Sequence, residues 1–312
     1  MVEDNQIEAK SSPFAIRQGE IKVFDGKDGY VSMNQIVHKI NIGHINDLHF
    51  KILELVNEFE FITSRQLCQI LTWKGIDYKS QDKLNNKLEQ MVKSKILTRY
   101  YFSSEEGKGI YRIYSLEKMG KYLLTSKEIE CKWQPTDNTK PVAMIKKRLA
   151  GNQTILAYLR KVKAFDEYTV KPTITAKSLA KTFKSTGGSV KLTKNNKSII
   201  FVFEVIRREE DWETKLVEKA RLYQDFYANF VAGDSGFSAM PQLIFICEDE
   251  KHMAECFRTI VTNKIEIPQI KLYFSTDLRQ NNETLAKTLV EFRLDEQTNK
   301  YKMDDVELKL LD

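Results

Sequence analysis

A predicted helix from Ser80 to about Lys95 carries side chains that could read the bases of duplex DNA. Its apolar residues recur at the spacing of one helix face, at Leu84, Leu88, Met91 and Val92. Asparagine and glutamine side chains pair with adenine edges, while lysine pairs with guanine or with phosphate. The remaining surface of the helix offers these side chains, and the candidate DNA contacts are Ser80, Gln81, Lys83, Asn86, Lys87 and Gln90.

Two predicted strands follow this helix and carry further basic residues. Residues 97–102 are rich in β-branched and aromatic side chains, and residues 110–114 form the return strand after a polar turn with two glycines. A hairpin in this place can contact the DNA backbone beside the groove. The candidate contacts on it are Arg99, Lys108 and Arg112, although two glutamates at the tip speak against deep insertion.

The charge of the chain is concentrated in one segment. The whole chain has 49 basic and 43 acidic residues, but residues 132–197 hold 15 basic residues against 3 acidic ones. Such an excess predicts a surface for a polyanion. The further candidate DNA contacts in this segment are Lys146, Lys147, Arg148, Lys191 and Lys194. The alternative is that these lysines are scattered over several faces and only keep the protein in solution.

Other chemistry is sparse in this sequence. The four cysteines form no C-x-x-C pair, and Cys68 and Cys247 lie in apolar runs that indicate core positions. Cys256 follows His252 by four residues, which makes half of a metal site, but no matching second half is evident. The four histidines form no cluster, and no glycine-rich phosphate loop occurs. We therefore expect no catalytic residue, no metal and no cofactor.

Three helices and a hairpin must position the candidate DNA-reading face. A helix begins near Asn46, and a second begins at Thr63, which caps it together with Gln66 three residues later, and closes at Gly75. The third helix, the hairpin and a short helix at residues 116–124 follow. This order is that of a winged helix-turn-helix, in which the third helix enters the major groove. A winged-helix module that binds a protein instead remains an alternative.

The rest of the chain predicts a second, larger domain. Residues 1–44 form a lead-in with a short strand at residues 21–24, residues 45–125 form the winged helix, and residues 126–140 form a linker. Residues 141–312 begin with a long helix and then alternate between strands and helices; apolar runs such as residues 199–203 indicate strands covered on both faces. The predicted fold class is therefore α+β or α/β, with a mixed sheet flanked by helices. Residues 300–311 form either a last strand or a tail.

The chain resembles the replication-relaxation family of plasmid and mobile-element proteins. The resemblance rests on the run from Thr63 to Leu67, on residues 94–99 at the end of the third helix, and on the apolar strand that ends in Glu204, with Lys215, Lys219 and Tyr223 on the next helix. It covers roughly residues 45–260. It implies an N-terminal winged helix and a C-terminal region with the element order of a restriction-endonuclease-like core.

Glu204 is the position where such a core would keep an acid for a metal ion. A metal-dependent nuclease also needs an acid on the preceding strand and a lysine two residues after the second acid. Here Ile206 stands at the lysine position, and no acid occurs between Tyr168 and Phe203. The sequence therefore predicts an inactive nuclease-like domain. We expect Glu204 to be either a remnant of such a site or a partner for Arg207 or Arg208, and we expect the lysines of residues 181–197 to bind phosphate.

The predicted function is a non-catalytic DNA-binding protein that acts in plasmid replication or as an accessory factor at a transfer origin. The alternatives are a metal-dependent nuclease with a rearranged site and a transcription regulator. The expected partners are double-stranded DNA and a relaxase or replication protein, and a homodimer is left open. No apolar run approaches the length of a membrane span, and the polar, acidic start argues against a signal peptide, so we expect a cytoplasmic protein without a membrane partner.

Overall fold

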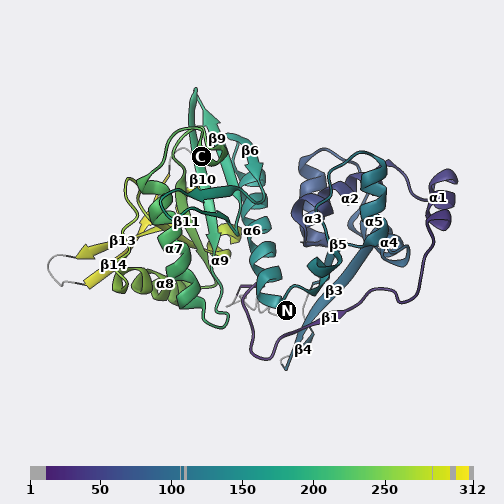
Figure 1. The fold of residues 1–312 in the computed structure, drawn as a ribbon, viewed down its shortest axis with the longest axis horizontal. Helices are drawn as coiled ribbons and strands as arrows, with labels where there is room; N and C mark the ends of the chain where they lie inside the picture. Colours follow the sequence, from purple (N-terminus) through teal and green to yellow (C-terminus); the bar gives the residue numbers. More distant parts are fainter. Residues whose placement is uncertain (1–11, 106, 109–110, 283, 296–299, 309–312) are drawn as a thin grey trace, which may run out of the picture. The chain divides into compact units, whose positions relative to one another are not determined.

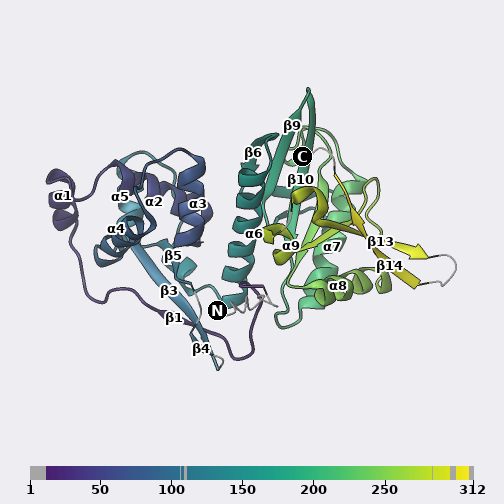
Figure 2. The ribbon, with the colours of Figure 1, turned by 180° about the vertical axis from the view of Figure 1, so that it is seen from behind.

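The computed structural model describes residues 12–105, 107–108, 111–282, 284–295 and 300–308. The chain divides into two compact units. The first, the N-terminal unit, contains residues Ile16–Arg160, and the second, the C-terminal unit, contains Lys161–Asp312 together with the residues that precede Ile16. Figures 1 and 2 show both units from opposite sides.

The N-terminal unit contains the predicted succession of three helices and a strand pair. Its helices and strands are β1 (Ile21–Phe24), α1 (Met33–Asn41), α2 (Asp47–Phe59), β2 (Ile62–Thr63), α3 (Ser64–Trp73), α4 (Gln81–Lys93), β3 (Leu97–Ser104), β4 (Gly107–Lys108), β5 (Ile113–Leu116), α5 (Lys118–Ser126), the 3-10 helix η1 (Pro135–Thr139) and α6 (Val142–Lys161). The helix starts follow the capping residues of the sequence. The hydroxyl of Thr63 accepts a hydrogen bond from the backbone N–H of Gln66, and the backbone N–H of Thr63 donates to the side-chain oxygen of Gln66, both at 3.1 Å.

The described part of the lead-in contains a helix as well as the predicted strand. Its strand β1 occupies the predicted residues and pairs antiparallel with β3, so that Ile21 lies opposite Ser103. The antiparallel sheet of this unit has the order β1-β3-β5-β2, with β4 on β3. Helix α1 was not predicted, although Ser32 and Gln35 form a capping box at its start.

Helix α6 belongs to the N-terminal unit through Arg160, beyond the boundary that we expected near residue 140. Its side chains and backbone bond to the helices and turns before it. The amide of Asn152 donates to the carbonyl oxygens of Phe59 at 3.2 Å and Phe61 at 2.7 Å, and Gln66 donates to the carbonyl of Leu149 at 2.7 Å. Buried polar groups need such partners, and these contacts explain why the helix packs with the residues that precede it.

The C-terminal unit contains a seven-stranded mixed sheet. Its helices and strands are β6 (Phe165–Thr169), β7 (Thr173–Ala176), β8 (Lys181–Lys184), β9 (Ser189–Lys194), β10 (Lys197–Val205), α7 (Trp212–Ala228), η2 (Asp234–Gly236), β11 (Gln242–Cys247), α8 (Glu250–Thr262), β12 (Tyr273–Thr276), α9 (Asp277–Asn282), η3 (Leu285–Lys287), β13 (Leu289–Asp295) and β14 (Lys300–Val306). The strand order is β14-β13-β12-β11-β10-β9-β6, and β7 and β8 form a separate pair.

The central strands of this sheet are parallel. Strand β11 pairs parallel with β10 on one side and with β12 on the other, while the outer strands pair antiparallel. Helices α7 and α8 (green in Figure 1) contribute the apolar side chains that pack with Val202, Phe245 and Phe274 of the sheet. The predicted mixed sheet with flanking helices is confirmed. The pair β7–β8, helix α9 and strand β13 were not predicted. For the last segment, which we expected to be either a strand or a tail, the structure shows the strand β14.

Candidate functional site

Helix α4 has a polar face, and the buried apolar residues on its opposite face fix its orientation. Ser80 caps the helix and accepts a hydrogen bond from the backbone N–H of Lys83 at 3.3 Å. The four predicted apolar residues are buried, with Leu84 and Leu88 fully so. Because their stripe fixes the rotation of the helix, the opposite face must point to solvent.

The exposed face of α4 consists of residues that are three, four and seven positions apart. Lys83, Asn86 and Gln90 are exposed, and Lys87 between them is half-buried. These spacings place all four side chains on one side of the helix. Ser80 is exposed at the start of the helix, whereas the amide of Gln81 donates to Asn85 at 3.2 Å. The predicted base-contact residues other than Gln81 are thus brought together on one surface.

His49 of α2 borders this face and stays uncharged. Its side chain is buried, and burial together with the positive charge of Lys87 lowers the pKa of His49 to about 4. The lysine and the glutamine at the end of the face therefore have a neutral neighbour near pH 7.

The predicted hairpin contacts do not form a comparable surface. Arg99 lies within 2.9 Å of the Asp25 carboxylate and also pairs with Glu89, which leaves its side chain 12% exposed. Its hydrogen bond holds the pKa of Glu89 below the usual value. The prediction that Arg99 contacts DNA is wrong, because two carboxylates already neutralise it. Arg112 pairs with Asp25 at 2.9 Å but stays 60% exposed, and the side chain of Lys108 lies outside the described residues.

Two of the three predicted cations on α6 are buried. Lys146 is 1% exposed and pairs with Glu20, and Arg148 is 6% exposed and lies 3.5 Å from Glu60. A buried, paired cation cannot reach a phosphate, so the prediction that these two residues contact DNA is wrong. Lys147 between them is half-buried.

The hairpin of β9 and β10 exposes a second group of lysines. Lys194 and Lys197 are exposed on either side of the turn residues Asn195 and Asn196, which adopt positive φ values of 52° and 60°. Two such residues in sequence are typical of the tight turn that joins twisted antiparallel strands. Figure 1 shows this hairpin projecting at the upper end of the C-terminal unit. Lys191, nearer the sheet, pairs with Asp166 at 3.2 Å.

Glu204 is buried in the sheet, and its two oxygens are already engaged. The hydroxyl of Thr186 donates to Oε1 at 2.8 Å, and the hydroxyl of Tyr223 donates to Oε2 at 2.8 Å. Lys219 lies 3.8 Å from Oε1. Glu204 as a whole residue is 1% exposed. Burial and the negative charge of Glu204 raise the pKa of Tyr223 far above its usual value. The expected pairing of Glu204 with Arg207 or Arg208 is therefore wrong.

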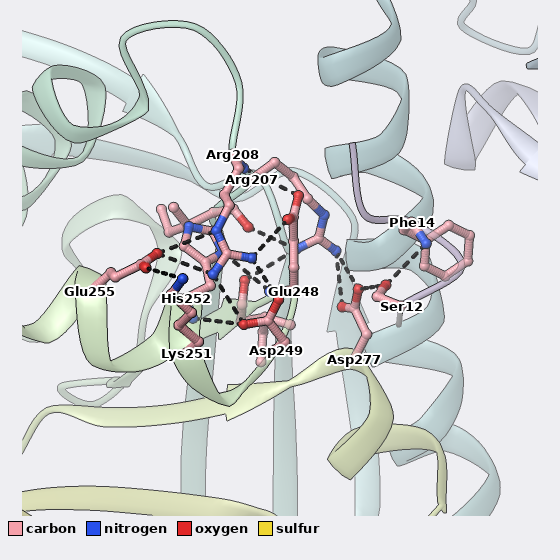
Figure 3. Close-up of polar contacts among 12 residues, drawn as sticks. Ser12, Phe14, Arg207, Arg208, Glu248, Asp249, Lys251, His252, Glu255 and Asp277 are labelled. Atoms are coloured by element: carbon pink, nitrogen blue, oxygen red, sulfur yellow. Dashed lines mark hydrogen bonds and ion pairs between the residues drawn. The ribbon is translucent and has the colours of Figure 1, made fainter. Parts of the chain in front are cut away.

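A cluster of charges that sequence analysis missed lies at the carboxyl ends of the parallel strands (Figure 3). Arg207 follows β10 and is fully buried, and its Nη2 donates to the carboxylate oxygens of Asp277, which follows β12, at 2.9 and 2.8 Å. Ser12 donates to the same carboxylate. Neighbouring parallel strands bring their ends together, and the signal was a charged residue directly after the last residue of β12 and shortly after the last residue of β10.

Arg208 completes this cluster with three carboxylates. It contacts Asp249 and lies 3.1 Å from Glu255 and 3.5 Å from Glu248. Burial raises the pKa of Asp249, but the hydrogen bonds from Arg208 and from the backbone of His252 outweigh it and lower the pKa. Since each carboxylate here faces a guanidinium, the cluster is suited to holding the strand ends together rather than to binding Mg²⁺.

Among the described residues, one group of three or more His, Cys, Asp or Glu side chains lies close enough to share a metal ion. It consists of Cys247, His252 and Cys256, all buried, whose donor atoms lie within 4.8 Å of one another. The interpretation of His252 and Cys256 as half a site without a counterpart is therefore wrong. Cys247 comes from the adjacent strand β11, a pairing that sequence spacing does not reveal.

No protein-family model and no curated protein matches the chain. Among solved structures, restriction endonuclease FokI is similar, with a TM-score of 0.25 and 11% identity over 73% of this chain and 41% of that chain. The chain thus spans less than half the length of that protein. A likeness this weak supports no conclusion about fold or function. Within the described part of the chain, no helix is long and apolar enough to cross a bilayer.

Proposed function

We propose that this protein binds double-stranded DNA through the exposed face of α4 and does not cut it. The observation that carries the proposal is the grouping of Lys83, Asn86 and Gln90 on one exposed helix face. A lysine and two amides in this arrangement suit the donor and acceptor pattern of the major groove. In this proposal α2, α3 and α4 with strands β3 and β5 act as a winged helix-turn-helix, in which α3 braces α4.

The β9–β10 hairpin is the second DNA contact of the proposal. Its exposed Lys194 and Lys197 flank a turn of two asparagines, and a two-stranded ribbon can follow a groove or its rim. Lysines that contact phosphate add affinity without sequence preference. The proposal thus assigns sequence recognition to the N-terminal unit and backbone contacts to the C-terminal unit.

The absence of cutting is proposed from the surroundings of Glu204. Two hydroxyls occupy its oxygens, and the side chain is 1% exposed. The described acids at the neighbouring strand ends pair with arginine. Following the family resemblance, we place the protein in plasmid replication or at a transfer origin, with a relaxase or replication protein as partner.

Gel shifts across a salt series test the binding. The wild-type protein is expected to shift duplex DNA at about 50 mM salt, with affinity falling steeply as salt rises. The Lys83→Ala/Asn86→Ala variant should lose affinity for the preferred sequence, while Lys251→Ala, which removes an 84% exposed lysine on α8, should bind as wild type. No shift of any duplex at about 50 mM salt would refute the proposal.

A nicking assay tests the absence of cutting. Supercoiled plasmid incubated with the protein and Mg²⁺ or Mn²⁺ should stay intact. Nicking by the wild-type protein that disappears in the Glu204→Ala variant would instead establish a metal-dependent nuclease.

A further inference from the structure

Three sulfur and nitrogen donors meet inside the C-terminal unit. Cys247 is the last residue of β11, and His252 and Cys256 lie on α8. The three side chains are fully buried, and their donor atoms lie within 4.8 Å of one another. The sulfur and imidazole donors form one compact group.

The start of α8 explains why these residues meet. Asp249 caps the helix two residues after the end of β11, and its side chain accepts a hydrogen bond from the backbone N–H of His252 at 2.7 Å. Cys256 follows His252 by one helical turn on the same buried face. The short connection therefore places both helix residues beside the last residue of the strand.

The imidazole of His252 has an unused ring nitrogen. Its Nδ1 accepts a long hydrogen bond from the backbone of Glu248 at 3.3 Å, whereas Nε2 is buried without a hydrogen-bond partner. Buried polar atoms usually have a partner. Burial and the charges of Arg208 and Arg207 lower the pKa of His252 to about 3, so the ring is neutral near pH 7 and able to act as a ligand.

Thiolate ligands would offset the positive charge of an ion bound in this buried group. Burial raises the pKa of the Cys256 thiol, while the positive charge of Arg208 acts in the opposite direction. A metal ion deprotonates such thiols on binding and releases their protons to solvent. Two thiolates then balance the charge of a divalent ion. With a monovalent ion, one negative charge is left over, and the nearby guanidinium of Arg208 stabilises it.

We propose that Cys247, His252 and Cys256 bind a thiophilic metal ion, Zn²⁺ or Cu(I). Two thiolates and an imidazole are the donors that these ions prefer over the oxygen ligands of Mg²⁺ or Ca²⁺. Bonds of about 2.0–2.3 Å hold donors about 3.5–4 Å apart, so donor atoms that lie within 4.8 Å need to approach one another by at most about 1.3 Å. The ion would fasten α8 to β11, and this role is independent of DNA binding.

Metal titration of the chelator-treated full-length protein tests this site. One equivalent of Zn²⁺ or, in a separate arm under reducing conditions, of Cu(I) should bind, with release of protons and a higher unfolding temperature. Cys256→Ser should lose this binding, and Cys131→Ser, which changes a half-buried cysteine in the other unit, should keep it. Binding that is absent in the wild type, or that survives in Cys256→Ser, would overturn the proposal.

X-ray absorption of the loaded wild-type protein gives a result that does not depend on a variant that folds. The spectrum should fit two sulfur ligands and one imidazole nitrogen, with a fourth light ligand for Zn²⁺ and none for Cu(I). A shell with one sulfur or none for both metals would refute the site.

Discussion

At the scale of single residues, buried charges in this protein hold separate segments together. Arg207 is fully buried, and its partners include the carboxylate of Asp277 and the carbonyl oxygen of Ile206 at 2.8 Å. Breaking such a pair by changing one partner is costly because it leaves an unpaired charge inside the protein, whereas an apolar replacement of both partners is often tolerated.

Replacing one member of this pair should therefore destabilise the C-terminal unit more than replacing both. We expect Arg207→Met and Asp277→Asn each to lower the free energy of unfolding by about 3–5 kcal/mol. The double variant Arg207→Met/Asp277→Leu should recover much of the loss. Urea denaturation measures both effects, and single variants within about 1 kcal/mol of the wild type would show that the pair is not an essential contact.

The neutral state of His49 gives a pH dependence at the same scale. Its pKa is lowered to about 4 in the folded protein, mainly by burial, against about 6.5 in the unfolded chain. The unfolded state therefore binds the proton more tightly between these values. The contribution of this residue to stability is complete above about pH 6.5 and is lost as the pH falls towards 4.

His49→Gln should flatten this part of the stability profile. Glutamine can keep the capping contact that His49 makes with the backbone of Asn46 but does not titrate. The loss of unfolding free energy between pH 7 and pH 4 should be smaller in this variant than in the wild type. The variant His38→Gln, at an exposed position, serves as the control and should follow the wild type. Parallel profiles for all three proteins would contradict the lowered pKa.

At the scale of elements, the sequence predicted those with strong local signals. Thr63 and Ser80 cap their helices as expected, and β11 occupies the predicted residues because its apolar run is bounded on both sides. Strand β13 gave no clear signal and depends on its pairing with β12 and β14. The local spacing of apolar residues does not reveal which distant segments pair. For the same reason the charge cluster at the strand ends was missed.

The β9–β10 hairpin should act as an element that contacts phosphates. If Lys194 and Lys197 each neutralise one phosphate, Lys194→Ala/Lys197→Ala should lower the slope of log affinity against log salt by about 2. The loss should be the same on every duplex sequence. The control Lys251→Ala/Lys302→Ala removes two exposed lysines of the same unit and should keep the slope. An unchanged slope in the hairpin variant would remove the hairpin from the interface.

At the scale of the whole molecule, the charge count overstated the basic surface. Residues 132–197 hold 15 basic and 3 acidic residues, but Lys146 and Arg148 pair inside the N-terminal unit with Glu20 and Glu60. These two acids lie far from residues 132–197 in the sequence. Counting the charges within that segment therefore could not show that they neutralise Lys146 and Arg148. Lys194 and Lys197 at the hairpin tip are exposed.

Selection from a randomised duplex pool tests whether α4 reads DNA sequence as proposed. The full-length protein should enrich one motif and bind it about 10³-fold or more tightly than unrelated duplex at about 150 mM salt. Lys83→Ala/Asn86→Ala should lose most of that ratio while keeping its affinity for unrelated duplex. A pool that shows no enrichment, or a variant that enriches the same motif to the same extent, would contradict sequence recognition by α4.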